Sequence, residues 1–362
     1  MDTPQKILVV KRDALGDLIS VTPFLEVVRR NWPAANISFV VGDWSRAALK
    51  NNPHLNHLIV VNSRAWQNPI GKFWRRHALV RQLRPERFDT VFILQGPAPF
   101  RFWEKFAQQI GAANRIGFRA WGAKTSLTSS VQLPRHHGHV FQELKKNRAE
   151  MFLDLLRCLG VRDTSNSGNR LYWQPADDKF AADFLHRHSL SGHLLVALAP
   201  GGASNPGLTQ LGKRWPLENY TALAAEILKN PRTRLIIIGG PTDRFLAEKL
   251  ISGLPAEWRH RVASAAGQST VHQSAAIIAR AKVFVGNDSG PLHIASATKT
   301  PIVGIFGPTN PVVDGPYHSA GVNLFHPGGA TPCYTKDCAG HSPCIARVTV
   351  SEVISAVNQY IN

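Results

Sequence analysis

No apolar run in this sequence is long enough to cross a bilayer. The longest runs, such as Leu235–Ile238, end after a few residues at glycine. The N-terminus also lacks the apolar core and small-residue cleavage site of a signal peptide, because Met1–Lys6 leads directly into the strand-like run Ile7–Val10. These absences argue against a membrane span and against export, and we expect a soluble, cytoplasmic protein.

Cysteine is also scarce. The 362 residues include four, at Cys158, Cys333, Cys338 and Cys344. In a chain of cytoplasmic character, structural disulfides are disfavoured. The last three lie near His326 and His341 in the sequence, which invites a zinc site, but neither gap between them has the short CxxC spacing typical of zinc. We therefore expect no metal, and thiols that are packed or merely exposed.

Acidic side chains are outnumbered. Asp and Glu total 24 against 42 Lys and Arg, which gives a formal net charge of +18. The segment 64–148, which begins at Arg64, holds 16 basic and 4 acidic residues. Such a field attracts a polyanion: nucleic acid, an anionic membrane surface or a phosphorylated glycolipid. A solvated basic face without a partner is the alternative.

Short apolar runs recur along the chain with helix-like segments between them. The runs are Ile7–Val10, Ile37–Val41, Leu58–Val61, Thr90–Leu94, Leu194–Ala199, Leu235–Ile238, Val283–Val285 and Ile302–Phe306. This alternation predicts parallel sheets covered by helices, and two series predict two doubly wound α/β domains. The turn-rich segment Asp163–Gly168 marks the expected boundary, so the domains are 1–168 and 169–349, followed by an amphipathic helix over 350–362.

The segment Lys11–Asp17 contains a single glycine, so it is not the GxGxxG turn of a nicotinamide-binding fold, and a dehydrogenase is disfavoured. Asp17 follows a strand near the start of a helix, where open α/β sheets bind ligands. Its carboxylate is a candidate to take a proton from an incoming hydroxyl. Alternatively, Asp13 or Asp17 only caps the helix. Lys11 and Arg12 either hold an anionic acceptor or are only surface charge.

A glycine-containing turn in the second half has the composition of a phosphate site. Pro200–Asn205 includes Gly202 and Ser204, and Lys213 follows shortly after. Small residues let backbone N–H groups approach an anion closely, and a lysine adds a compact positive charge. The alternative is a glycine-rich connection with an incidental lysine.

Two further turns follow strand-like runs. Asp243, after Gly239–Gly240, is placed either to accept hydrogen bonds from ribose hydroxyls or to cap the next helix. In Gly286–His293, Asp288 or Ser289 can cap a helix whose first turn contains Pro291. The exposed N–H groups of that segment then form an anion or sugar site, or the segment is only a well-capped turn.

Taken together, these segments resemble glycosyltransferase family nine, the ADP-heptose:lipopolysaccharide heptosyltransferases. The segments that carry the resemblance span nearly the whole chain and are Lys11–Asp17, Leu94–Gly96, Arg115–Phe118, Pro200–Gly201, Lys213–Pro216, Gly239–Pro241, Gly286–His293 and Gly307–Thr309. The spaced cysteines Cys333, Cys338 and Cys344 also look like a family feature. The resemblance implies the GT-B fold, in which two Rossmann-like doubly wound domains face a central cleft. At Ile93 the sequence departs from many relatives, which carry an acidic residue there, so that strand is assigned no catalytic part.

The resemblance also implies site residues and a mechanism. Asp17 matches the catalytic base and Lys213 the donor-phosphate lysine of an inverting, single-displacement transfer. Charge on the departing diphosphate is stabilised by Lys213 and by backbone N–H groups near Gly202 and Gly290. The full donor-site set is Gly202, Ser204, Lys213, Asp243, Asp288, Ser289, Gly290 and His293, and the acceptor-site set is Lys11, Arg12 and Arg64. No cofactor or metal is implied beyond the nucleotide-sugar donor, ADP-heptose.

The implied acceptor is the anionic inner core of lipopolysaccharide, whose carboxylates and phosphates suit the basic first half of the chain. The implied location is the cytoplasmic face of the inner membrane, with peripheral contact. A GT-B transferase that uses another nucleotide sugar or acceptor is the alternative within enzymes. A basic nucleic-acid-binding protein is the alternative from another class, but the chain has no recognisable nucleic-acid-binding motif, so we expect no nucleic-acid partner.

Overall fold

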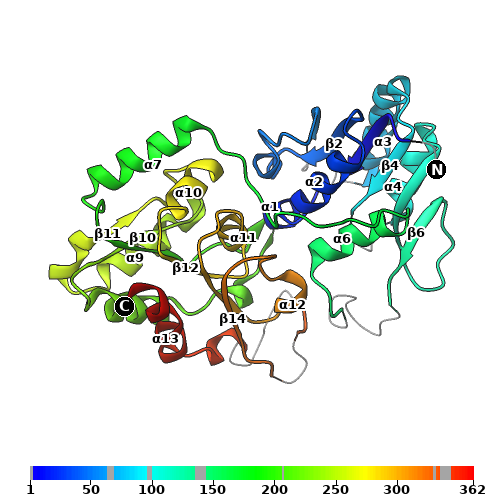
Figure 1. The fold of residues 1–362 in the computed structure, drawn as a ribbon. Coiled ribbons are helices and arrows are strands. Elements are labelled where there is room, and N and C mark those ends of the chain that lie inside the picture. Colours follow the sequence, from blue (N-terminus) through cyan, green and yellow to red (C-terminus); the bar gives the residue numbers. More distant parts are fainter. Residues whose placement is uncertain are drawn as a thin grey trace. The chain divides into compact units, whose positions relative to one another are not determined.

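The structure is a computed structural model that describes residues 3–62, 69–95, 100–134, 144–205, 208–328, 332–334 and 344–362. The chain forms two compact units, Met1–Ser167 and Gly168–Asn362 (Figure 1). The boundary expected from the sequence, at residue 168, lies one residue from this division. Among the described residues, no helix is long and apolar enough to cross a membrane.

The first unit contains a parallel sheet with the order β3-β2-β1-β4-β5-β6. Its strands are β1 (Lys6–Val10), β2 (Asn36–Gly42), β3 (His57–Val61), β4 (Thr90–Ile93), β5 (Asn114–Arg119) and β6 (Ser129–Gln132). Its helices are α1 (Leu15–Ile19), α2 (Thr22–Asn31), α3 (Pro69–Leu83), α4 (Phe100–Gln109) and α6 (Arg148–Arg157). The central strands β1, β2 and β4 are apolar almost throughout because they are buried, as parallel strands with both faces covered are.

The second unit repeats this plan with the order β11-β10-β7-β12-β13-β14, again all parallel. The strands are β7 (Leu194–Ala199), β10 (Thr233–Ile237), β11 (Val262–Ser264), β12 (Val283–Asn287), β13 (Ile302–Phe306) and β14 (Gly321–Phe325). A two-stranded antiparallel ribbon pairs β8 (Ser204–Asn205) with β9 (Leu208–Thr209). The α-helices are α7 (Pro175–Arg187), α8 (Leu217–Leu228), α9 (Arg244–Ser252), α10 (Val271–Ile278), α11 (Gly290–Ser296), α12 (Pro311–Asp314) and α13 (Val350–Ile361).

Short 3₁₀ turns complete the elements. They are η1 (Arg46–Ala48), η3 (Arg84–Glu86), η4 (Leu211–Lys213), η5 (Pro241–Asp243), η6 (Ala256–Arg261) and η7 (Cys344–Arg347). The C-terminal helix expected from about Val350 is α13, and its start is set by a capping box in which Thr349 and Glu352 exchange side-chain to backbone hydrogen bonds. Val353, Val357 and Ile361 on its inner face join the core formed by β7, β10, β12 and α8.

Each sheet has the doubly wound strand order in which the chain starts in the middle, winds to one edge and then to the other. The order reverses between β1 and β4 in the first unit and between β7 and β12 in the second. In such sheets, ligands bind outside the carboxyl ends of the strands at this reversal. The fold therefore directs attention to the turns after β1 and β4 in one unit, and after β7 and β12 in the other.

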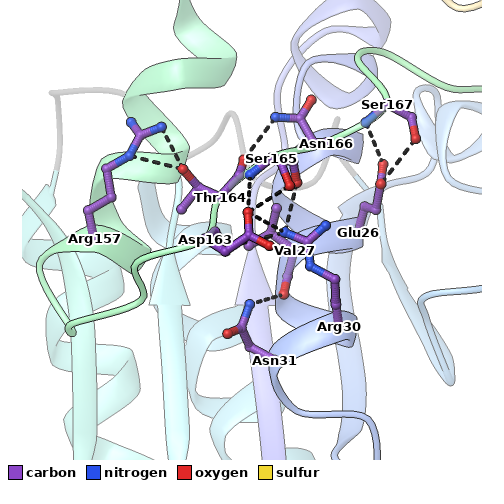
Figure 2. Close-up of polar contacts among 10 residues, drawn as sticks. All are labelled: Glu26, Val27, Arg30, Asn31, Arg157, Asp163, Thr164, Ser165, Asn166 and Ser167. Carbon is purple, nitrogen blue, oxygen red and sulfur yellow. Dashed lines mark hydrogen bonds and ion pairs between the residues drawn. The ribbon is translucent and has the colours of Figure 1, made fainter.

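The segment that leads out of the first unit is fixed to α2 (Figure 2). Arg30 donates to the carbonyls of Asp163 and Ser165 at 3.2 and 2.8 Å. The Glu26 carboxylate accepts hydrogen bonds from the backbone N–H and the hydroxyl of Ser167, both at 3.0 Å. These contacts explain why the first unit extends to Ser167, where the sequence is polar and would otherwise read as a free linker.

Candidate active site

A buried ion pair lies at the carboxyl end of β1. Lys11 is 1% exposed, and its Nζ donates to the Asp13 carboxylate at 2.6 Å and to the Leu94 carbonyl at 3.2 Å. The ammonium also lies 5.1 Å from the centre of the Phe152 ring. The alternative that Lys11 is only a surface charge is therefore wrong. Its charge holds the β1–α1 turn against β4. We therefore propose no role for Lys11 in binding the acceptor.

Gln95, directly after β4, holds the same turn. Its side-chain oxygen accepts from the backbone N–H of Arg12 at 2.9 Å, and its amide donates to the Asp13 carboxylate. The Arg12 guanidinium lies 5.8 Å from the Trp103 ring. Burial lowers the pKa of Arg12 to about 10, although Asp13 and Asp43 act in the opposite sense. Arg12 is thus a cation at neutral pH and is partly desolvated. An anion binds such a group more strongly than it binds one in water.

Asp17 lies in the first turn of α1, and its side chain does not cap that helix. Ala14 occupies the N-cap position without a side-chain hydrogen bond. One Asp17 oxygen, Oδ1, lies 3.1 Å from Nη1 of Arg148, the first residue of α6, and the Asp17 side chain is 25% exposed. The carboxylate is therefore held by a cation and remains reachable from solvent. That it acts as a base stays a prediction.

In the second unit, Gly202 and Asp243 shape the turn after β7. The buried Asp243 carboxylate accepts from the backbone N–H groups of Gly202 at 3.0 Å and Gly240 at 2.8 Å. Gly202 has φ of +80°, and a Cβ there would lie 2.6 Å from Oγ of Ser289, so only glycine fits against Ser289 at this point. The Gly202 N–H already has an acceptor, and the binding of the donor diphosphate by backbone N–H groups near Gly202 stays a prediction. A ribose contact by Asp243 stays a prediction.

Lys213 and Asp288 form the polar centre of the β7/β12 reversal. Lys213 Nζ lies 2.7 Å from Oδ2 of Asp288, which also accepts from the Thr309 hydroxyl at 2.7 Å. His293 Nε2 lies 3.7 Å from the other Asp288 oxygen. Burial alone would raise the pKa of Asp288, but Lys213 and His293 outweigh that effect and hold the pKa well below its ordinary value. The Asp288 carboxylate is therefore ionised at neutral pH.

Two groups in this cluster suit a bound ligand. The Lys213 side chain is 19% exposed, so its ammonium can reach an anion from solvent. Nδ1 of His293 is buried and has no hydrogen-bond partner within the described part of the chain, and a ligand would satisfy it. Gly290 begins α11, and Ser289 occupies its N-cap position, but the Ser289 hydroxyl donates to the Asn287 carbonyl and does not cap the helix.

Asn287 connects the segments around this cluster. It is fully buried, and its Oδ1 accepts from the backbone N–H of Trp215 and from the Tyr220 hydroxyl, both at 3.0 Å. Its Nδ2 donates to the carbonyls of Pro200 and Gly201 at 3.2 and 3.3 Å. One side chain thus ties the turn after β7, the start of α8 and the end of β12 together.

Arg214 fixes the outer part of the turn after β7. Its guanidinium donates twice to the Gly202 carbonyl, at 3.0 and 2.8 Å, and once to the Ser204 hydroxyl at 3.2 Å. The sequence interpretation assigned no role to Arg214, Asn287 or Arg148. Asn287 lies within the segment Gly286–His293, and Arg214 lies next to Lys213, so the sequence offered a reason to consider both residues. It offered no such reason for Arg148.

Several sequence candidates lie outside the described residues. They are Arg64, proposed for the acceptor, and Cys338 and His341 of the possible metal site. Cys344 is buried and Cys333 is half-buried. Within the described ranges, no group of three or more His, Cys, Asp or Glu side chains is placed to hold a metal ion.

Comparisons with known proteins agree with this picture. Residues 76–342 match the model of glycosyltransferase family 9 (heptosyltransferase). Over 310 residues the chain is 24% identical to lipopolysaccharide heptosyltransferase 2 of Escherichia coli K12, and the match covers 84% of each protein.

Solved structures show the fold. The glycosyl transferase family 9 structure from Veillonella parvula DSM 2008 superposes with a TM-score of 0.81 at 24% identity, covering 100% of this chain and 98% of that one. The E. coli ADP-heptose LPS heptosyltransferase II structure superposes with a TM-score of 0.74 at 22% identity, covering 99% and 98%. The expected GT-B fold class, two Rossmann-like α/β domains, is confirmed.

Proposed function

The chain belongs to glycosyltransferase family 9, the heptosyltransferase family, and we propose that this glycosyltransferase moves a heptose from ADP-heptose to the inner core of lipopolysaccharide with inversion at the anomeric carbon. The observation that supports a nucleotide-diphosphate donor best is the Lys213–Asp288 cluster at the β7/β12 reversal. There a partly exposed ammonium, a buried carboxylate and a buried imidazole nitrogen without a partner among the described residues lie together. The carboxyl-end location is where doubly wound sheets bind nucleotides.

Each unit contributes its own part of the proposed reaction. Asp17 in the first unit accepts the proton of an acceptor hydroxyl, whose oxygen forms a bond to the anomeric carbon of the heptose. The bond from that carbon to the diphosphate breaks, and ADP leaves with the electron pair. Lys213 offsets the negative charge that grows on the leaving diphosphate. A lysine in this role removes the need for a metal ion.

The proposed acceptor is anionic, and Arg12 is the described residue best suited to bind it. Its guanidinium is partly desolvated, which strengthens pairing with a carboxylate or phosphate. Arg75 on α3 and Arg81, Arg84 and Arg87 further along are exposed. We propose that these exposed arginines bring the enzyme to the anionic face of the inner membrane on the cytoplasmic side, where the acceptor lies.

Two assays test the proposal. Calorimetry with ADP, UDP and GDP identifies the nucleotide, and we expect ADP to bind most tightly. Turnover with ADP-heptose and a heptose-free core acceptor, followed by anomeric analysis of the product, tests the sugar, the acceptor and the inversion. Preferred binding of UDP or GDP, or turnover only with another nucleotide sugar, would establish the alternative transferase instead.

A further inference from the structure

The ion pair between Arg148 and Asp17 joins the first residue of α6 to the first turn of α1. Nη1 of Arg148 lies 3.1 Å from Oδ1 of Asp17, and the two side chains are 16% and 25% exposed. The start of α6 is itself fixed, because the Asn147 side chain accepts from the backbone N–H of Ala149. Arg148 is thus held at a capped helix start and is mostly covered by protein.

The inner face of α6 packs against Lys11, at the start of the turn that leads into α1, the helix that contains Asp17. Phe152, one helical turn after Arg148, lies under the ammonium of Lys11, 5.1 Å away, and Phe118 of β5 lies 6.2 Å from Phe152 between ring centres. Residues four apart share one helix face. The packing of Phe152 therefore fixes where Arg148 meets Asp17, and the ion pair is not a chance contact of two surface chains.

The two carboxylates of this turn have different partners. Asp13 is paired with Lys11 and Gln95, so it does not compete with Asp17 for Arg148. Asp17 contacts Arg148 through Oδ1, and the Asp17 side chain is 25% exposed. One oxygen is thus anchored, and the carboxylate is still reachable from solvent.

From this geometry we propose that Arg148 is a positioning residue for the transfer: it anchors the Asp17 carboxylate through Oδ1 and leaves Oδ2 to accept the proton of the acceptor hydroxyl. The inference rests on the proposed role of Asp17 as the base. In this proposal Arg148 touches neither the donor nor the reacting atoms and acts on the reaction through Asp17. A base that turns away from its hydroxyl loses rate steeply, because proton transfer requires hydrogen-bond reach.

The test compares Arg148→Ala and Arg148→Lys with a matched control, Lys146→Gln. Lys146 also carries a positive charge at the start of α6, but it pairs with Asp154 at 2.7 Å. We expect Arg148→Ala to lower kcat about a hundredfold. We expect Arg148→Lys to recover part of that loss, because an ammonium restores the charge but not the planar fork. Lys146→Gln should turn over like the parent, and ADP affinity should be unchanged in all three.

Chemical rescue separates positioning from a merely structural effect. Millimolar guanidinium, far below denaturing concentrations, should restore part of the kcat of Arg148→Ala and leave Lys146→Gln unaffected. If Arg148→Ala does not fold, the test compares kcat of Arg148→Lys with kcat of Lys146→Gln. The inference requires the lower kcat in Arg148→Lys, and equal values would overturn it.

Asp17→Asn distinguishes failure of this inference from failure of the proposed function. If Asp17→Asn abolishes turnover while Arg148→Ala turns over like the parent, Arg148 has no positioning role and the base assignment stands. If Asp17→Asn is as fast as the parent, the base assignment fails, and this inference fails with it. If Arg148→Ala raises KM for the acceptor and leaves kcat unchanged, Arg148 binds the acceptor instead, which also overturns the proposal.

Discussion

Replacing Asn287 with alanine should destabilise the second unit by about 3 kcal/mol. The buried backbone N–H of Trp215 loses its acceptor, and the Pro200 and Gly201 carbonyls lose their donor. Tyr220 is less affected, because its hydroxyl also lies 3.2 Å from the Ala199 carbonyl. An unsatisfied buried polar group costs about 1–3 kcal/mol. We count the Trp215 backbone N–H at about 2 kcal/mol and each of the two carbonyls, which keep another lone pair, at about 0.5 kcal/mol, the lower end of what a hydrogen bond contributes.

Calorimetric melting measures this cost. For a domain of about 150–250 residues, 3 kcal/mol corresponds to a melting temperature lower by about 6–12 °C. The affinity for ADP should fall as well, since Asn287 holds the turn after β7 against β12. Gln359→Ala, which removes an exposed amide from α13 in the same unit, should melt within about 2 °C of the parent. A melting temperature of Asn287→Ala as close to the parent as that of the control would refute the reasoning.

Further predictions concern the same region. Lys213→Ala should weaken ADP binding at least about tenfold, because a charge-assisted contact to phosphate is lost; unchanged affinity in calorimetry would remove Lys213 from the donor site. Because the folded protein holds the pKa of Asp288 below its ordinary value, the stabilisation by this carboxylate is present above about pH 4 and is lost as the pH falls through the folded value. Asp288→Asn should therefore melt below the parent at pH 7, with a gap that narrows below about pH 4; a gap that does not vary with pH would contradict this origin. Gly202→Ala places a Cβ 2.6 Å from the Ser289 hydroxyl and should lose ADP binding, whereas Gly122→Ala, at a similar φ of +68° but with no heavy atom within 4 Å, should not. Equal ADP affinities of the two glycine variants would show that the close approach is unimportant.

Most of the strands inside the two sheets were predictable from the sequence, as was the edge strand β3, which the run Leu58–Val61 marked. Apolar runs identified β1, β2, β4, β7, β12 and β13, because strands buried on both faces contain few polar residues. No strand was predicted for β6 (Ser129–Gln132) or β14 (Gly321–Phe325), which lie at the edges of their sheets and are partly exposed. The sequence of β6, Ser-Ser-Val-Gln, is mostly polar and reads as a loop.

The turns that carry the candidate site were predictable because they follow apolar strands. Which side chains come together in these turns was not predictable from the sequence. The sequence left Lys11 as either an acceptor contact or a surface charge, yet Asp13 and the Leu94 carbonyl bond its ammonium and make its burial possible. Burial of a lysine depends on partners that only the tertiary structure brings together. Arg148 similarly reaches Asp17 only because α6 packs beside the β1–α1 turn.

The central claim is that Asp17 is the base of a heptose transfer from ADP-heptose. The most direct measurement is single-turnover transfer from ADP-heptose to a heptose-free lipopolysaccharide core by the parent and by Asp17→Asn, with ADP affinity measured for both. The account predicts that the parent transfers heptose and that Asp17→Asn binds ADP equally well but transfers at least about a hundredfold more slowly. Equal transfer rates for the two proteins, or no transfer by the parent, would contradict it.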